Sequence, residues 1–314
     1  MTRYVLRRLA VAVPLVLVVA TISFFLVQLV PGSPAAAILG PTATQDQVDA
    51  LERSLGLDAP ATTQFVDWLT GAAHGDLGRS YVTGQPVSDA LSQALAPTLS
   101  LAVLSTLLTL GLGLVMGMAA AVRGGRTDKA VQWVGSLGMA IPNFWLAALL
   151  VFVLAIELPL FPATGYAELA TEGLGPWLSH LVLPVLALSA VNLGQIAFQA
   201  RAAFADALGR DYVRTLQATG TPRRRVLFKH VLRNASVPVV TVTGLTFIFT
   251  LGGVVILELI FNLPGLGNLM LRSVQTNDFS VVQGGVLYFS LAVILVNLVV
   301  DVATASLDPR VRVR

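Results

Sequence analysis

The sequence has no cysteine, and its only histidines are His74, His180 and His230. Without cysteine there can be no disulfide, thiol nucleophile or cysteine metal ligand. The histidines are far apart and form no HExxH motif, so we expect no metal site. Neither Lys129 nor Lys229 follows a glycine, which excludes a Walker A loop, and no GxSxG serine motif is present. We therefore expect no catalytic site, no cofactor and no ATP hydrolysis in this chain itself.

Charge is also scarce, because only 12% of the residues are charged while 55% are hydrophobic, and the mean hydropathy is +0.77. An apolar run of about 20 residues can cross the roughly 30 Å of hydrocarbon in a bilayer. Six such runs are present, at about 9–30, 98–122, 131–157, 179–200, 235–261 and 283–307. Each must be a helix, because lipid offers no partner for unpaired backbone groups. The sequence predicts an all-α integral membrane protein with six transmembrane helices.

The basic residues predict the orientation of these spans. If the N-terminus is cytoplasmic, all of the 20 lysines and arginines except Arg53, Arg79 and Arg272 lie on the inside. We therefore expect both termini to be cytoplasmic. The net charge of +3 then follows from topology, and no nucleic-acid binding is expected. The first apolar run, Leu9 to Val30, is long for the core of a signal peptide, so we expect it to remain as an uncleaved span.

We expect two parts in the chain: residues 1–97, with the first span and an outside helical segment, and residues 98–314, a five-helix core. In the outside segment, "TQDQVDALERSL" has the caps and spacing of an amphipathic helix, "GLDAP" ends it, and "FVDWL" begins another. This segment could be a platform for an external partner or a cap packed over the outer mouth. Its sequence does not decide between the two.

Glycines and prolines inside the spans predict close helix packing and kinks. Gly113 and Gly117 form a GxxxG motif, and the pairs Gly252–Gly253 and Gly284–Gly285 offer further contact points. Prolines within or at the ends of spans are Pro142, Pro184 and Pro238. Such kinks suit a moving pathway, but they also occur in static bundles.

Polar and ionisable residues inside spans are costly and are candidates for function. Glu258 lies near the expected outer end of the fifth span, and Asn297 and Asp301 lie towards the inner end of the sixth. A pathway or gate role is one interpretation of these three residues. The alternative is a structural hydrogen bond near the membrane interface, which we favour slightly. The spans contain no series of acidic residues such as a proton relay would require.

The fourth connection, at about 201–233, holds the most unusual stretch, "QATGTPRRRVLFKH". Gly220 is a natural helix stop, Thr221 a candidate N-cap, and Pro222 suits the first position of a new helix. Arg223, Arg224 and Arg225 then fill that helix's first turn, where the helix dipole disfavours cations. Upstream, an apolar stripe recurs every four residues, at Phe204, Leu208, Tyr212 and Leu216.

A helix, a break and a second helix with an arginine-rich first turn can dock into another protein. The alternative is a topology signal whose arginines lie on anionic headgroups, worth about 1 kcal/mol each. The defined break favours docking modestly.

Seven stretches, taken in order along six spans, resemble the membrane subunits of ABC importers, in the dipeptide/oligopeptide permease family and specifically the first of its paired subunits. They are "LVPGSP" (29–34), "GLDAP" (56–60), "GDLGRS" (75–80), "IPNFW" (141–145), "HLVLPVLALS" (180–189), "DYVRTLQATGTPRRRVLFKHVLRNASVP" (211–238) and "ELIFNLPGLG" (258–267). The resemblance implies the type I ABC importer permease fold and a location in the bacterial plasma (inner) membrane.

The same resemblance implies that the fourth connection is a coupling loop that fits a groove on an ATP-hydrolysing partner. In that family the loop has the pattern Glu-Ala-Ala, three further residues and a glycine. Gly220 matches the glycine. Leu216 departs from the pattern at a position where alanine is expected, and Thr219 at a position where a basic residue is frequent. The implied ATPase-coupling residues are Arg214, Thr215, Leu216, Ala218, Gly220, Thr221, Pro222, Arg223, Arg224 and Arg225. A secondary contact is implied for "RGGRTDK", with Arg123, Arg126 and Lys129.

The implied partners are a second, homologous permease subunit, two cytoplasmic ATP-binding subunits and an external substrate-binding protein. The implied cargo is a di- or oligopeptide, and family members that carry nickel chelates, glutathione or haem keep those cargoes open. A secondary transporter and a non-transporting scaffold are alternatives from other classes, but the chain has neither inverted repeats nor a buried ion-coupling set.

Overall fold

The computed structural model describes residues 2–30, 32–40 and 42–307. The arginines of the tail, Arg310, Arg312 and Arg314, lie outside the described residues. In these ranges the chain is helical apart from connections and one isolated bridge between Arg79 and Pro86. Five of the described helices are long and apolar enough to cross a membrane, and a bent pair makes a sixth if it counts as one span. The predicted all-α membrane architecture is confirmed, whereas the side on which the termini lie stays a prediction.

The chain divides into two compact units. One contains Leu99–Leu263 and the described residues from Val296 onwards, and the other contains Thr2–Thr98 and Pro264–Leu295, within the described ranges. The first unit's elements are most of α5 (Val87–Arg123), α6 (Gly125–Ala140), α7 (Asn143–Leu150), the π-helix η1 (Val151–Glu157), α8 (Leu169–Glu172), α9 (Leu174–Gly209), α10 (Asp211–Ala218), α11 (Arg223–Arg225), the π-helix η2 (Val226–Val231) and α12 (Leu232–Ile260). The second unit's elements are α1 (Thr2–Gln28), α2 (Pro34–Leu39), α3 (Gln45–Leu55), α4 (Ala61–Ala73), α13 (Leu266–Gln275) and the first part of α14 (Phe279–Leu307).

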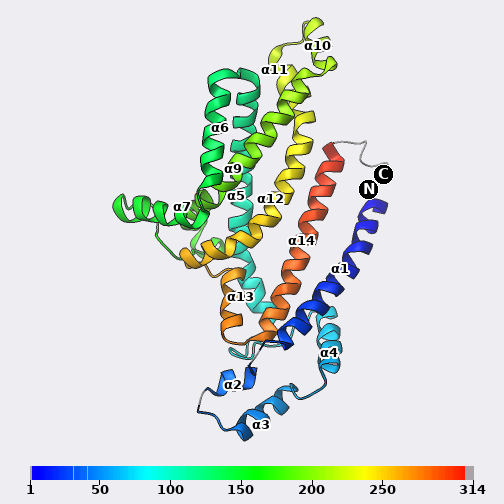
Figure 1. Ribbon diagram of the computed structural model, residues 1–314, viewed down its shortest axis with the longest axis vertical. Helices are drawn as coiled ribbons and strands as arrows, with labels where there is room; N and C mark the ends of the chain where they lie inside the picture. Colours follow the sequence, from blue (N-terminus) through cyan, green and yellow to red (C-terminus); the bar gives the residue numbers. More distant parts are fainter. Residues whose placement is uncertain (1, 31, 41, 308–314) are drawn as a thin grey trace. The chain divides into compact units, whose positions relative to one another are not determined.

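In the first unit, α9 packs along α6 and α12, and α5 runs beside them (Figure 1). Glycines allow these helices to approach closely, as the GxxxG motif predicts. A Cβ at Gly113 would lie 2.7 Å from Cγ2 of Ile196 on α9, and a Cβ at Gly135 would lie 2.8 Å from the ring of Phe198. A Cβ at Gly252, in contrast, would meet no atom within 4 Å in the described part of the chain.

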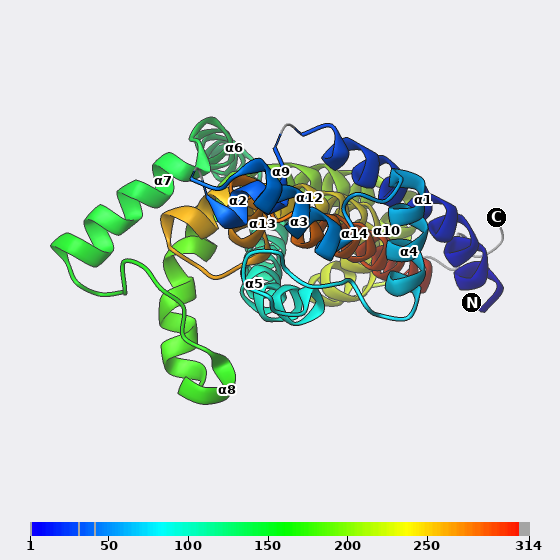
Figure 2. The same cartoon turned by 90° about the horizontal axis from the view of Figure 1, so that it is seen from below.

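The third expected span, 131–157, is two helices bent by 96° rather than one straight helix. The break falls at Ile141 and Pro142. Proline forces the residue before it into an extended conformation, and Ile141 has φ −92° and ψ 122°. Pro142 then precedes α7, and α7 leaves the bundle sideways (Figures 1 and 2). The hydropathy pattern continues across the bend and therefore did not reveal it.

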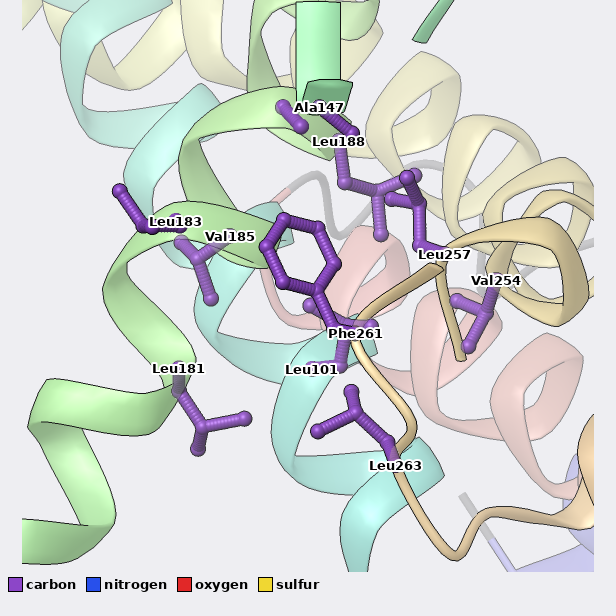
Figure 3. Close-up of a cluster of buried hydrophobic side chains, with 11 residues drawn as sticks. Leu101, Ala147, Leu181, Leu183, Val185, Leu188, Val254, Leu257, Phe261 and Leu263 are labelled. Atoms are coloured by element: carbon purple, nitrogen blue, oxygen red, sulfur yellow. The ribbon is translucent and has the colours of Figure 1, made fainter. Parts of the chain in front are cut away.

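A core of buried apolar side chains joins α5, α9 and the end of α12 (Figure 3). Phe261 lies in its middle, near Leu183 and Val185 of α9 and Leu257 of α12. The chain passes on from α12 through Phe261 and Leu263, both buried. This packing fixes the end of α12 against α9.

The second unit confirms both helices expected in the outside segment. α3 begins with a capping box between Thr44 and Gln47 and ends at Gly56, which has φ +70°. Its apolar face is only partly covered, because Val48 is buried whereas Leu55 is exposed. α4 follows and packs against α1.

Candidate functional site

The segment between α9 and α12 is built as three short pieces. α9 ends at Gly209, Arg210 is extended with φ −76° and ψ 149°, and α10 follows. The apolar stripe expected on one helix is therefore interrupted at Arg210. It still packs as one surface, because Phe204 is fully buried and Tyr212 and Leu216 lie against the same core. Within α10 the buried residue is Val213, which the four-residue spacing missed.

α10 ends at Ala218, and Gly220 follows the C-cap residue Thr219, as its predicted role as a helix stop requires. Gly220 has φ +76°, and its N–H donates to the carbonyl of Gln217 at 3.0 Å. The N–H of Thr221 donates to the carbonyl of Leu216, also at 3.0 Å. These two bonds form a Schellman motif, which closes a helix end and needs a residue that tolerates positive φ.

The next helix begins one residue later than expected. The N–H of Thr221 donates to Leu216 in the preceding turn, so Thr221 belongs to the end of α10. Pro222, with φ −56° and ψ 135°, is the N-cap instead of the first helical residue. α11 then continues through η2 into α12, so the three arginines do occupy the first turn of a long helix. Val226 and Val231 are buried and anchor this start to the bundle.

Arg223, Arg224 and Arg225 are all exposed. In the described part of the chain, no acidic side chain lies within 4.0 Å of any of them. Arg214, Thr215 and Ala218 are exposed as well, while Leu216 is half-buried. A small hollow of about 150 Å³ opens beside Arg223, between Gln217, Leu208 and Val226. The segment therefore presents cations and a turn to its surroundings, on an apolar support.

Two ion pairs within the segment are local. Arg210 pairs with Asp206 at 2.8 Å and Arg214 with Asp211 at 3.5 Å, and all four side chains are largely exposed. The hydrogen bond to Asp206 raises the pKa of Arg210 above its ordinary value. Exposed pairs of this kind contribute little to stability.

The predicted secondary contact lies between α5 and α6, where Gly124 and Gly125 have φ +60° and +52°. Arg123, Arg126 and Lys129 are exposed there. Between them, Asp128 forms a two-pronged ion pair with Arg201 of α9. This pair could not be predicted from the sequence, because the two residues are far apart in the chain and each has ordinary neighbours.

The candidate pathway residues do not form one site. Glu258 is fully buried near the end of α12, Asn297 is exposed and Asp301 is half-buried on α14. A Cβ at Gly244 of α12 would clash with Val300 of α14, so these helices touch at that level. Glu258 lies further along α12, about 21 Å away at 1.5 Å per residue.

α9 carries a polar feature that we did not predict from the sequence. Asn192, Gln195 and Gln199 recur at i, i+3 and i+7 inside the fourth span, which places them on one helix face. The Nδ2 of Asn192 donates to Oγ1 of Thr250 on α12 at 2.9 Å. The signal in the sequence is the amide spacing within an apolar run. Among the described residues, no group of three or more metal-ligating side chains is present.

Known proteins resemble the chain along its whole length. The family described as "Binding-protein-dependent transport system inner membrane component" matches residues 110–313, and its N-terminal companion matches residues 1–102. A probable peptide ABC transporter permease protein of Sinorhizobium fredii is 39% identical over 98% of this chain and 99% of its own. A glutathione transport system permease protein of Salmonella choleraesuis is 40% identical over 99% of both.

A solved structure of the methionine ABC transporter MetNI, in an inward-facing conformation, matches with a TM-score of 0.56. The match covers 69% of this chain and 96% of that chain at 15% identity, so it shows the fold alone. The predicted importer permease fold is thus confirmed. With two family matches that together span nearly the whole chain, the protein belongs to the inner-membrane components of binding-protein-dependent transport systems and is a multi-pass ABC importer permease.

Proposed function

We propose that this permease carries di- or oligopeptides across the bacterial inner membrane as one half of a translocation pathway. The observation that carries the proposal is the full-length similarity, at 39% identity, to permeases named for peptide transport in Sinorhizobium fredii and Brucella abortus. Glutathione is a second candidate cargo, favoured by relatives of equal identity that are named for it. Glutathione is itself a tripeptide, so both candidates share the chemistry of a peptide chain.

The segment from Arg214 to Arg225 docks into a cytoplasmic ATPase subunit in this proposal. Its three arginines are exposed and have no acidic partner within the described chain, although their own helix dipole disfavours them. Acidic groups on a partner would supply the missing counter-charge. Arg123, Arg126 and Lys129 make a secondary contact with the same partner.

The mechanical link is the continuity of α11, η2 and α12. A push on the docked first turn passes along one helix into the membrane, because no break separates Arg223 from Ile260. ATP-driven closure of two ATPase subunits would move this lever and switch the bundle between inward- and outward-facing states. ATP hydrolysis belongs to those subunits, and this chain contributes no catalytic group.

Orientation and assembly complete the proposal. Both termini are cytoplasmic, by the distribution of the basic residues. A second homologous permease forms the other half of the pathway, and an external binding protein delivers the cargo. Residues 1–97 and 98–314 act as the outside-facing part and the permease core, with Glu258, Asn297 and Asp301 as candidates for pathway or gate.

The test is gentle extraction of the tagged chain from its native membranes, followed by mass identification of the proteins that co-purify. We expect a second permease, ATPase subunits and a binding protein whose bound ligand is a peptide. Recovery of the chain alone, under conditions that preserve other importers, would contradict the assembly. Recovery of the full complex with a binding protein that holds no peptide would contradict the cargo.

A further inference from the structure

The middle of the amide face of α9 is exposed at Gln195, whereas Asn192 and Gln199 are half-buried. α5 packs against Ile196 and Ala200, and α6 packs against Gly194 and Ala190. Asn192 borders α12 through its bond to Thr250. At 100° per residue, Gln195 falls in the sector between α6 and α12, and it is exposed.

The polar groups on this face lie inside α9, which is long and apolar enough to cross a membrane. Gln195 precedes Arg201 by about 9 Å along the helix, and Asn192 by about 14 Å, at 1.5 Å per residue. A carboxamide that faces lipid at this depth loses its hydrogen bonds to water, which is unfavourable. Polar side chains inside spans therefore face protein or a water-filled cavity.

Among the described residues, the neighbouring hydroxyls bond to Asn192 but not to Gln195 or Gln199. Thr243, Thr246 and Thr250 of α12 repeat the same i, i+3, i+7 spacing, but each hydroxyl donates to the carbonyl four residues before it, at 2.7 to 2.9 Å. Thr250 accepts from Asn192, and within the described chain the side chains of Gln195 and Gln199 bond to no other group. Towards the end of α9 the same face continues to the exposed Asp206.

We infer that this face of α9 lines a water-filled path, in which the carboxamides of Gln195 and Gln199 bind the main chain of the transported peptide. The inference rests on the proposed function. A carboxamide both donates and accepts, as a peptide group does, so it can pair with any peptide regardless of side chains. Asn192 is held by Thr250 and positions the start of this polar track. Such contacts favour passage of many peptides over strict selection.

The absence of cysteine from this chain allows a direct test. In the assembled importer, Q195C and Q199C are exposed to a charged, water-soluble methanethiosulfonate reagent, and labelling of this subunit is followed by mass. The control is L107C, at an exposed apolar position of α5. Because the reagent needs a thiolate in water, we expect Q195C to react at least about tenfold faster than L107C. Equal rates for the two variants, or reaction of Q195C only after the subunits are separated, would overturn the inference.

Uptake of radiolabelled trialanine supplies the second readout. We expect Q195L to lower uptake about five- to tenfold in a complex that still assembles and hydrolyses ATP, with Q195N close to the unmodified importer. Unchanged uptake by Q195L would overturn the role of this amide. If the unmodified importer takes up no trialanine, the proposed peptide cargo fails, and a fast reaction of Q195C would still establish the water-filled path.

Discussion

Arg201 of α9 and Asp128 of α6 form a bidentate ion pair, in which Nη2 donates to Oδ2 at 2.6 Å and Nε donates to Oδ1. Asp128 lies in the first turn of α6, where the helix dipole also favours an acid. The pair joins the α5–α6 connection to the end of α9, so it links the two basic regions proposed to meet the ATPases. Bidentate geometry makes it stronger and more specific than an ordinary surface pair.

Loss of this pair should destabilise the bundle. We expect D128N to lower the thermal unfolding midpoint of the detergent-solubilised chain by about 2–4 °C. The matched control is D206N, which removes the exposed pair with Arg210 and should shift the midpoint by less than about 1 °C. Equal shifts for the two variants would show that the Arg201–Asp128 pair stabilises the fold no more than an exposed ion pair does.

Gly220 should be required for coupling because of its backbone conformation. A Cβ there would meet no atom within 4 Å, but φ is +76°. Valine at this φ costs about 1–2 kcal/mol, and the turn that presents the arginines would distort. We expect G220V to lower ATP-dependent uptake at least tenfold with normal membrane insertion. G220N is the control, since asparagine tolerates positive φ, and its uptake should stay near normal.

The three arginines of α11 should determine binding of the ATPase subunits. We expect the triple variant R223E/R224E/R225E to reduce co-purification of the ATPases about tenfold or more, because like charges at an interface oppose association. R53E, on the exposed surface of α3, should leave co-purification unchanged. If the triple variant retains the ATPases but inserts poorly, the arginines serve as a topology signal on lipid headgroups.

In the second unit, Asp278 should hold the loop after α4. Its carboxylate is buried and accepts from the hydroxyl of Ser80 and, at 3.0 Å, from the N–H of Tyr81. Removing the acceptor from one buried and one partly buried donor costs about 1.5–3 kcal/mol. We expect D278A to speed proteolysis of the segment around residue 80, measured by limited digestion and mass. The exposed D89N should digest like the unmodified protein, and identical digestion of D278A would refute the role of Asp278.

Features set by local sequence were predictable. The apolar runs, the capping box of α3 and the helix stop at Gly220 depend on residues a few positions apart, and each is present. Errors arose where competing local rules met. Thr221 forms part of the turn that ends α10, so Pro222 is the N-cap and the next helix starts one residue later than expected. The regular apolar spacing from Phe204 to Leu216 predicted one helix, but the chain is extended at Arg210.

By itself, the sequence determined the membrane class, the approximate spans and the asymmetry of basic charge, because hydropathy and charge act along the chain. Only the tertiary structure decided the pairing of Arg201 with Asp128 and the separation of Glu258 from Asp301. It also decided that Asn192 of α9 bonds to Thr250 of α12 while Gln195 is exposed. These features depend on which faces of distant helices pack together, and close packing at glycines such as Gly113 and Gly135 sets those faces.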